Sequence, residues 1–190
     1  MAIGITLCTY GQVVTTTADS GAGSLRDIIA NASNGDVITF DISIQGQTIT
    51  LTSPIIVDIP GAGGVLSVLQ INGNNGGTPT TISGGGTSRI FEISTSSAMV
   101  GTYTINDIIF DSGASSGGQG GAITVSDTAT TLSLVNTSFT NNTAAGSILG
   151  NGGGAIVVVD ASLNISGTSI FSSNTASIVC HSSSHQYNPT

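Results

Sequence analysis

Gly120-Gly121-Ala122-Ile123 recurs as Gly153-Gly154-Ala155-Ile156, and each copy precedes a Phe-x-x-Asn element. That element reads Phe139-Thr140-Asn141-Asn142 after the first copy and Phe171-Ser172-Ser173-Asn174 after the second. Both pairs recur at an interval of about 32 residues, which lies within the range of solenoid repeats. A turn, a strand start and an aromatic residue that recur in the same order indicate one structural unit stacked on its own copy.

Short strand signals surround the repeat and fill most of the chain. Two successive units each hold three of them, at residues 122–125, 131–135 and 138–139 and at residues 155–159, 163–165 and 170–171. The connections between them are too short for hairpin returns or crossover helices, so the chain must wind in one direction. We therefore predict an all-β fold, a right-handed parallel β-helix of about five coils.

The composition agrees with an all-β chain and excludes several partners. The 190 residues are 38% hydrophobic but only 6% charged, so one domain can bury a core while long helices with charged faces are disfavoured. The net charge is −8, and Arg26 and Arg89 are the only Lys or Arg residues. Phosphate binding requires several clustered cations, which excludes nucleic acids and disfavours anionic membranes. The patterned aliphatic residues argue against the alternative of a disordered Gly/Ser/Thr-rich chain.

One good helix signal lies ahead of the strands. Ser24 can cap this helix and Asp27, three residues later, has the capping-box spacing. The apolar residues at i, i+3, i+4 and i+7 are Leu25, Ile28, Ile29 and Ala32. We expect the helix to end at Asn34-Gly35 and to cover the N-terminal end of the core, with Arg26 facing solvent or paired with a turn acid.

The predicted organisation has three parts. Residues 1–45 form the N-terminal strand and helix cap, residues 46–176 form the coils, and residues 177–190 form a polar tail. A third Gly-Gly-Ala-Ile copy is missing after Ala176, which predicts that the solenoid ends there with an exposed edge. Residues 1–10 lack the basic and apolar regions of a secretory signal, and no run of about 18 apolar residues predicts a membrane span.

The two cysteines, Cys8 and Cys180, lie near opposite ends of the chain. Their separation fits neither a zinc site nor a small disulfide framework. Five coils at about 4.8 Å each would place them about 24 Å apart, beyond the limit of about 7 Å for a disulfide. They are either unrelated thiols or form a disulfide between two chains placed end to end. A disulfide within one chain would require the tail to fold back.

The repeated tetrapeptides resemble those of the polymorphic outer membrane proteins of chlamydiae and of related autotransporter passengers. The segment from Thr17 to Phe40, which contains an Asp19-Ser20-Gly21 turn followed by Ser24-Leu25-Arg26, is similar to the N-terminal cap of many secreted bacterial β-helices. Together these features cover about residues 13–176. The resemblance implies export, an extracellular or outer-membrane-associated location and adhesion, and it does not imply catalysis. Members of that family are usually far longer, so we expect a fragment or a small relative.

The repeated motifs first predict a scaffold, with direct partner contact as the alternative. The Gly-Gly pairs should supply positive φ and close backbone approach at a coil corner, and Ala-Ile should begin a strand. Phe139 and Phe171 should stack inside the solenoid. Asn142 and Asn174 should form a side-chain ladder.

An enzyme is the competing hypothesis, because parallel β-helices also host polysaccharide lyases and hydrolases. Such sites need clustered carboxylates, or Ca²⁺ with a base. The acids of this chain lie mostly at turns, and only Asp107 and Asp111 come close to a pair. We expect solvated turn acids, no cofactor and no metal, with Arg89 bridging to Glu92 or Asp111. His181 and His185 fit a disordered tail better than a metal site.

Three functional hypotheses follow. The first is a non-enzymatic bacterial surface or secreted module that binds a protein or carbohydrate of a host or neighbouring cell. The second is a filament subunit that stacks end to end on copies of itself. The third is a polysaccharide lyase or hydrolase. An ice-binding face is disfavoured, because the Thr-x-Thr pieces do not recur at every coil.

Overall fold

Parallel strand pairing between successive turns builds the whole architecture. The computed structural model describes residues 11–59, 66–74, 76–95, 100–117, 119–146 and 153–178. Within these residues every pairing of strands is parallel and joins one turn to the next. The chain is therefore a parallel β-solenoid, as the repeat predicts. Cys8, Cys180, His181 and His185 lie outside the described residues.

The elements are short and follow one another without long helices. They are β1 (Gly11–Val14), α1 (Leu25–Ala30), β2 (Asp36–Phe40), β3 (Thr48–Thr50), β4 (Ile55–Val57), β5 (Leu66–Asn72), β6 (Thr80–Ser83), β7 (Phe91–Ile93), β8 (Val100–Asn106), β9 (Ile108–Asp111), β10 (Ala114–Ser115), β11 (Ile123–Val125), β12 (Thr130–Val135), β13 (Ser138–Thr140), β14 (Thr143–Gly146), β15 (Ile156–Val158), β16 (Ser162–Ser166), β17 (Ile170–Ser172) and β18 (Thr175–Ile178). Among these residues no helix is long and apolar enough to cross a membrane.

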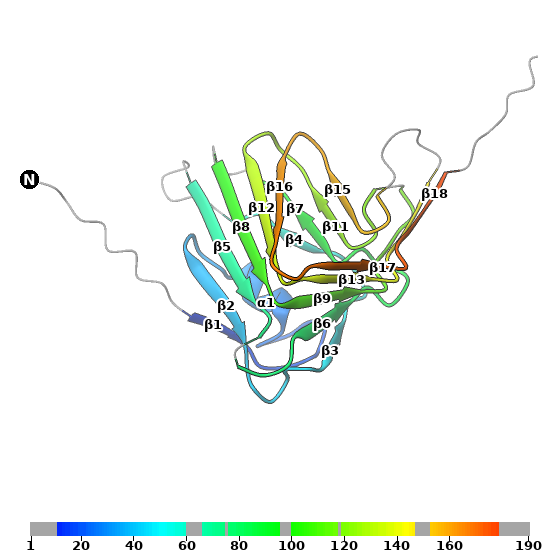
Figure 1. The fold of residues 1–190 in the computed structure, drawn as a ribbon. Coiled ribbons are helices and arrows are strands. Elements are labelled where there is room, and N and C mark those ends of the chain that lie inside the picture. Colours follow the sequence, from blue (N-terminus) through cyan, green and yellow to red (C-terminus); the bar gives the residue numbers. More distant parts are fainter. Residues whose placement is uncertain are drawn as a thin grey trace, which may run out of the picture.

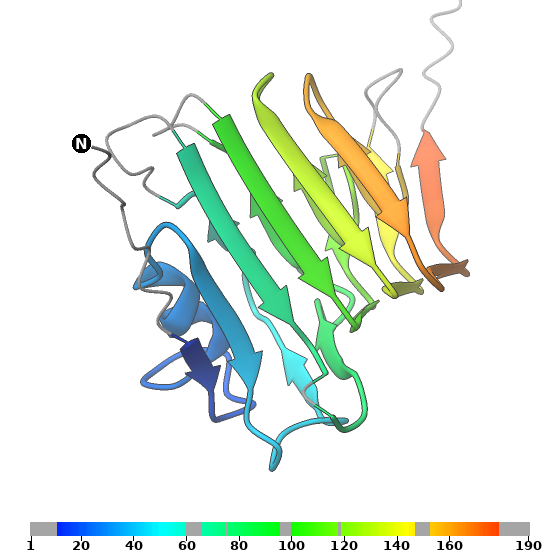
Figure 2. The same ribbon diagram turned by 60° about the vertical axis from the view of Figure 1, so that its left-hand side comes forward.

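Four parallel sheets form the walls of the solenoid (Figures 1 and 2). Sheet A has the order β1-β2-β5-β8-β12-β16, sheet B β3-β6-β9-β13-β17, sheet C β4-β7-β11-β15 and sheet D β10-β14-β18. Each turn runs from sheet A through sheet B to sheet C, with sheet D at the corner in the later turns. In the described residues four turns are complete and β16 to β18 begin a fifth, close to the five coils predicted.

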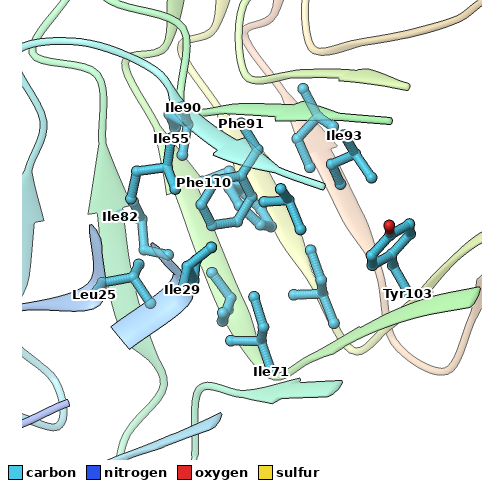
Figure 3. Close-up of a cluster of buried hydrophobic side chains, with 14 of the residues drawn as sticks. Leu25, Ile29, Ile55, Ile71, Ile82, Ile90, Phe91, Ile93, Tyr103 and Phe110 are labelled. Atoms are coloured by element: carbon cyan, nitrogen blue, oxygen red, sulfur yellow. The ribbon is translucent and has the colours of Figure 1, made fainter. Parts of the chain in front are cut away.

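The core forms because each strand alternates and each turn stacks in register on the one before. In β12, for example, Leu132 and Leu134 are buried while Ser133 between them is partly exposed. The pairing then stacks inward residues of successive sheet A strands, namely Ile38, Ile71, Ile105, Leu134 and Ile165. Each fully buried aliphatic side chain contributes about 1.5–3 kcal/mol of burial free energy. Figure 3 shows part of this cluster, including Ile71, Phe91, Tyr103 and Phe110.

Helix α1 covers the N-terminal end of the core. Ser24 Oγ accepts the Asp27 N–H (3.2 Å), which confirms the predicted cap, and Leu25 and Ile29 are buried. The reciprocal bond differs from the prediction, because Asp27 Oδ2 accepts the N–H of Gly23 (3.3 Å) rather than that of Ser24. The helix also ends earlier than predicted, at Ala30.

Arg26 joins this cap to the first turn. Its guanidinium pairs with the Asp19 carboxylate at 2.6 Å. This pair is one of the two alternatives predicted for Arg26, a contact with a turn acid. It also donates to the carbonyl oxygens of Ser53 (2.7 Å) and Pro54 (2.8 Å), just before β4. Arg26 is therefore a brace between the cap and the solenoid.

Three phenylalanine rings stack at the sheet B wall. Phe110, Phe139 and Phe171 occupy equivalent positions in successive turns, with ring centroids 4.8 Å apart in each stacked pair. Phe110 and Phe139 are fully buried, whereas Phe171 is 48% exposed because no described turn covers it. The predicted stacking is confirmed, but Phe171 lies at the end of the core rather than inside it.

Replacing Phe139 with alanine tests this stack. Phe139→Ala removes a ring held between two others and should lower the free energy of unfolding by about 3–5 kcal/mol. Phe171→Ala is the matched control, since it removes the same ring from a half-exposed position and should cost clearly less. Urea unfolding followed by circular dichroism measures both, and equal losses in the two variants would contradict the described packing.

Candidate functional site

The repeated Gly-Gly-Ala-Ile motifs form the corner that leads into sheet C. The two copies lie directly on each other, because Gly121 N–H donates to Gly154 O and Ala122 N–H to Ala155 O, both at 2.8 Å. Ala122, Ile123 and Ala155 are buried and Ile156 packs partly against the core. These residues therefore belong to the scaffold.

Close backbone approach, rather than positive φ, is what these glycines share. A Cβ on Gly120 or Gly153 would lie 2.1 or 2.0 Å from the carbonyl oxygen of Ile123 or Ile156. Of the four glycines in the two motifs, only Gly120 has a positive φ, of 40°. The expectation of positive φ for both pairs is wrong for Gly121, Gly153 and Gly154, whose constraint is the lack of space for any side chain.

Asn142 and Asn174 form the predicted ladder. Asn142 is fully buried; its Nδ2 donates to Asn174 Oδ1 (2.9 Å) and Phe110 O (3.1 Å), and its Oδ1 accepts the Gly113 N–H (2.8 Å). Asn174 Nδ2 donates to Phe139 O at 2.9 Å. The two side chains thus satisfy backbone groups that a corner would otherwise leave buried and unpaired.

The structure contains a third member of this series that the sequence interpretation missed. Phe110-Asp111-Ser112-Gly113 pairs in register with the first Phe-x-x-Asn element, so Gly113 occupies the place of the asparagine. A Cβ there would lie 2.8 Å from Asn142 Oδ1. The residue before this position has a positive φ in each turn, at Ser112, Asn141 and Ser173 (50–55°). A search for Phe-x-x-Gly could have found it.

The two acids that came closest to a catalytic pair are both engaged at corners. Asp107 Oδ1 accepts from Asn136 Nδ2 of the next turn (3.2 Å). Asp111 accepts from Ser112 Oγ (2.7 Å), Thr140 Oγ1 (2.8 Å) and Asn141 Nδ2 (3.0 Å). Partial burial alone would raise the pKa of Asp111, but these hydrogen bonds outweigh it and hold the pKa below the ordinary value of 3.8. The carboxylate is thus an ionised brace between turns.

Sheet A presents a broad outer face without charge. The outward residues alternate with the buried ones and are Val37, Thr39, Val68, Gln70, Asn72, Thr102, Thr104, Asn106, Thr131, Ser133, Val135, Ser162, Asn164 and Ser166. They form rows across the strands, such as Gln70, Thr104, Ser133 and Asn164, with about 4.8 Å between neighbours. Adjacent amides bond within the face, as Asn106 Nδ2 does to Asn72 Oδ1 at 2.6 Å.

Arg89 has the predicted ion pair on the outer side of sheet C. Its guanidinium bonds Glu92 Oε1 and does not bond Asp111, the other partner considered. It also donates to the carbonyl oxygens of Gln119 (2.6 Å) and Gly120 (3.0 Å) in the next turn. A cavity of about 410 Å³ lies beside this ion pair. No motif in the sequence points to it.

The C-terminal end of the core is open in the described chain. Leu163, Ile165 and Phe171 pair with buried residues of the previous turn and so face inward, yet Ile165 is 46% exposed. A cavity of about 400 Å³ lies among these residues and Ala155, Ile156, Ser173 and Asn174. This surface contains the predicted exposed edge and several of the predicted motif residues.

The comparisons with known proteins leave the family open. No protein-family model matches the chain, and no curated protein matches its sequence. The resemblance to polymorphic outer membrane proteins therefore stays a prediction, while the parallel solenoid is shown by the structure.

Within the described ranges, no group of three His, Cys, Asp or Glu residues could hold a metal ion.

Acid should weaken the solenoid through its corner carboxylates. Partial burial would raise the pKa of Asp19, but hydrogen bonds from Thr52 and Arg26 lower it, as the corner bonds lower that of Asp111. A carboxyl group whose pKa is lower in the folded state stabilises the protein at pH values above 3.8, its pKa in the unfolded state. That stabilisation is lost as the pH falls from about 3.8 through the lower folded value. The urea midpoint of Asp111→Asn should therefore fall less than that of the wild type between neutral and acid pH.

Thr140→Val provides the intermediate case for this experiment, because it removes one of the three donors to Asp111. Its dependence on pH should lie between those of the wild type and Asp111→Asn. An Asp111→Asn variant with the full pH dependence of the wild type would contradict the role given to this carboxylate.

Proposed function

We propose that this chain is a non-enzymatic module of a bacterial surface or secreted protein and acts as an adhesin. The observation that carries the proposal is the uncharged outer face of sheet A, which spans strands from β2 to β16. Its partner would be a protein or carbohydrate on a host or neighbouring cell. The resemblance of the repeats to surface passengers supports the same function.

The physical properties of this face favour contact rather than chemistry. Its Ser, Thr, Asn and Gln side chains can both donate and accept hydrogen bonds. The stacked backbone holds them in fixed rows, so binding would cost little ordering of the protein. A face without charge would also bind with little dependence on salt.

The engagement of the corner acids supports a non-enzymatic module. A general acid or base needs a pKa near the working pH, whereas Asp111 is held ionised by three donors. Asp107 is bonded to Asn136 and has a corner φ of 53°. These carboxylates join turns to each other, and a scaffold role accounts for both.

A charged residue at the centre of sheet A tests the proposal. Ser133→Lys should weaken binding of the labelled protein to cultured epithelial cells by at least about tenfold, because an unpaired ammonium would be desolvated in the contact. Ser138→Lys on the outer face of sheet B makes the same change elsewhere and should leave binding unchanged. Equal losses in both variants, or wild-type binding by Ser133→Lys, would overturn the assignment of this face.

Self-association is the second candidate function, favoured by the apolar end that the described residues leave uncovered. Helix α1 and Arg26 cover the opposite end, which argues against head-to-tail stacking into a filament. Two open ends can instead meet about a two-fold axis, with their edge strands antiparallel, and form a closed dimer. Among described residues 153–178 only Asp160 is charged, so two such ends would repel each other little.

Sedimentation under reducing conditions separates these alternatives, because reduced Cys8 and Cys180 cannot link chains. The wild type should dimerise and Ile165→Asp should be monomeric, since it places a carboxylate in the contact. Ile42→Asp changes a 68% exposed residue after β2 and should still dimerise. A wild type that is monomeric at all concentrations would exclude self-association, and long fibres would exclude the two-fold arrangement.

A further inference from the structure

The cavity of about 410 Å³ beside the Arg89–Glu92 pair is a groove that crosses the outer face of sheet C from one turn to the next. Its floor consists of Ile56, Glu92 and Thr124, which pair directly on the adjacent strands β4, β7 and β11. Ser94, Ser126 and Val159 follow the ends of β7, β11 and β15 and line one side. Since floor and side both follow the stacking direction, the groove suits an extended ligand that lies along the solenoid axis.

The opposite side of the groove is held in place by Arg89. This side chain is only 14% exposed and bonds Glu92, Ser115 Oγ (3.0 Å) and the carbonyl oxygens of Gln119 and Gly120. It thereby fixes Gln119 and Gly120 against the edge of the groove. A wall held by several hydrogen bonds is preformed, which reduces the ordering cost of binding.

Polar atoms in the groove retain unused hydrogen-bonding capacity. Thr124 Oγ1 is buried and has no hydrogen-bond partner among the described residues. Glu92 uses only Oε1 in its contact with Arg89, and its side chain is 40% exposed. Less than 1 Å² of Thr124 Oγ1 is accessible, so a ligand reaches it only when rotation about χ1 turns the hydroxyl into the groove. A bond from the ligand would then satisfy a hydroxyl that is otherwise buried without a partner.

Charge and composition limit the class of ligand. Both Arg residues of the chain are already in ion pairs, so no unpaired guanidinium is left to attract an acidic polymer. Glu92 is the only carboxylate that lines the groove, and a single carboxylate paired with Arg89 is a poor cation site. No aromatic side chain lines it, which disfavours flat apolar ligands. Hydroxyl groups beside small apolar surfaces match a neutral sugar ring.

We propose that this groove binds a neutral oligosaccharide along the solenoid axis. Hydroxyl groups of the sugar would bond Glu92, Ser126 and, after its rotation into the groove, the Thr124 hydroxyl. The C–H faces of the sugar would pack on Ile56, which is 57% exposed, and on Val159. The assignment rests on the proposed function, because it treats the chain as a binding module and names one class of its partners. Without aromatic stacking, affinity at a single site should be in the millimolar range.

Chemical-shift titration of the ¹⁵N-labelled chain tests the groove. The probes are the tetrasaccharides of β-linked glucose, β-linked N-acetylglucosamine and α-linked mannose, with that of galacturonic acid as the acidic probe. At least one neutral probe should shift the amides of Glu92, Thr124 and Ser126 in a saturable manner. The acidic probe should not.

Two variants locate the binding. Thr124→Val removes the unpaired hydroxyl and Ser126→Leu fills the groove, and each should weaken the neutral probe by about tenfold. Thr124→Val should fold at least as stably as the wild type, because its hydroxyl has no partner to lose. Thr81→Val and Ser138→Leu make the same changes on the outer face of sheet B and should leave the affinity unchanged.

The outcomes distinguish the groove from the broader function. The groove assignment fails if no neutral probe binds, or if Thr124→Val and Ser126→Leu bind as tightly as the wild type. Cell binding that depends on Ser133 would still support the adhesin in either case. Cleavage of a probe by the wild type would overturn the non-enzymatic function, and loss of that cleavage in Ser126→Leu would still support the groove.

Discussion

Parallel pairing in register obliges each residue to lie about 4.8 Å from its counterpart in the next turn, and the rest of the structure depends on that constraint. This spacing favours side chains that pack well on an identical side chain in the next turn. Phe110, Phe139 and Phe171 stack at this spacing, and Asn142 bonds Asn174 across it. It also explains the low charge of the chain, because like charges stacked at this spacing would repel each other.

The corners carry the second constraint, since a chain that bends at every few residues exposes backbone groups to a dry interior. Residues with positive φ make the bends, at Asp107 and Asn136 before sheet B and at Ser112, Asn141 and Ser173 after it. The side-chain amides of Asn142 and Asn174 then bond backbone groups of the neighbouring turn. Corner acids add charged acceptors to this network. Asp107 and Asp111 thus join successive turns through bonds to Asn136, Thr140 and Asn141.

Sequence reasoning succeeded where a feature is repeated or local. The solenoid, the Ser24 cap, the phenylalanine stack, the asparagine ladder and the Arg89–Glu92 pair follow from recurrence or from short spacing along the chain. The expectation that the Gly-Gly pairs share a positive φ was wrong, because what these glycines share is the lack of space for a Cβ. Gly120 and Gly153 lie against a carbonyl oxygen three residues later, and Gly121 and Gly154 lie against the next turn. The groove on sheet C was missed because Ile56, Glu92 and Thr124 share no motif. Only the register of three turns brings them together.

The two ends of the described solenoid differ in local stability. The first turn is covered by α1 and held by Arg26, whereas β16 and β17 are largely exposed and have a described neighbour on one side only. In a stack where each turn contacts only its neighbours, opening begins at the turn with the fewest contacts and spreads from there. Backbone amides should therefore become progressively better protected from solvent exchange from β17 toward β5. Among the described turns, the one that holds β16 and β17 would open first and the capped turns would open last.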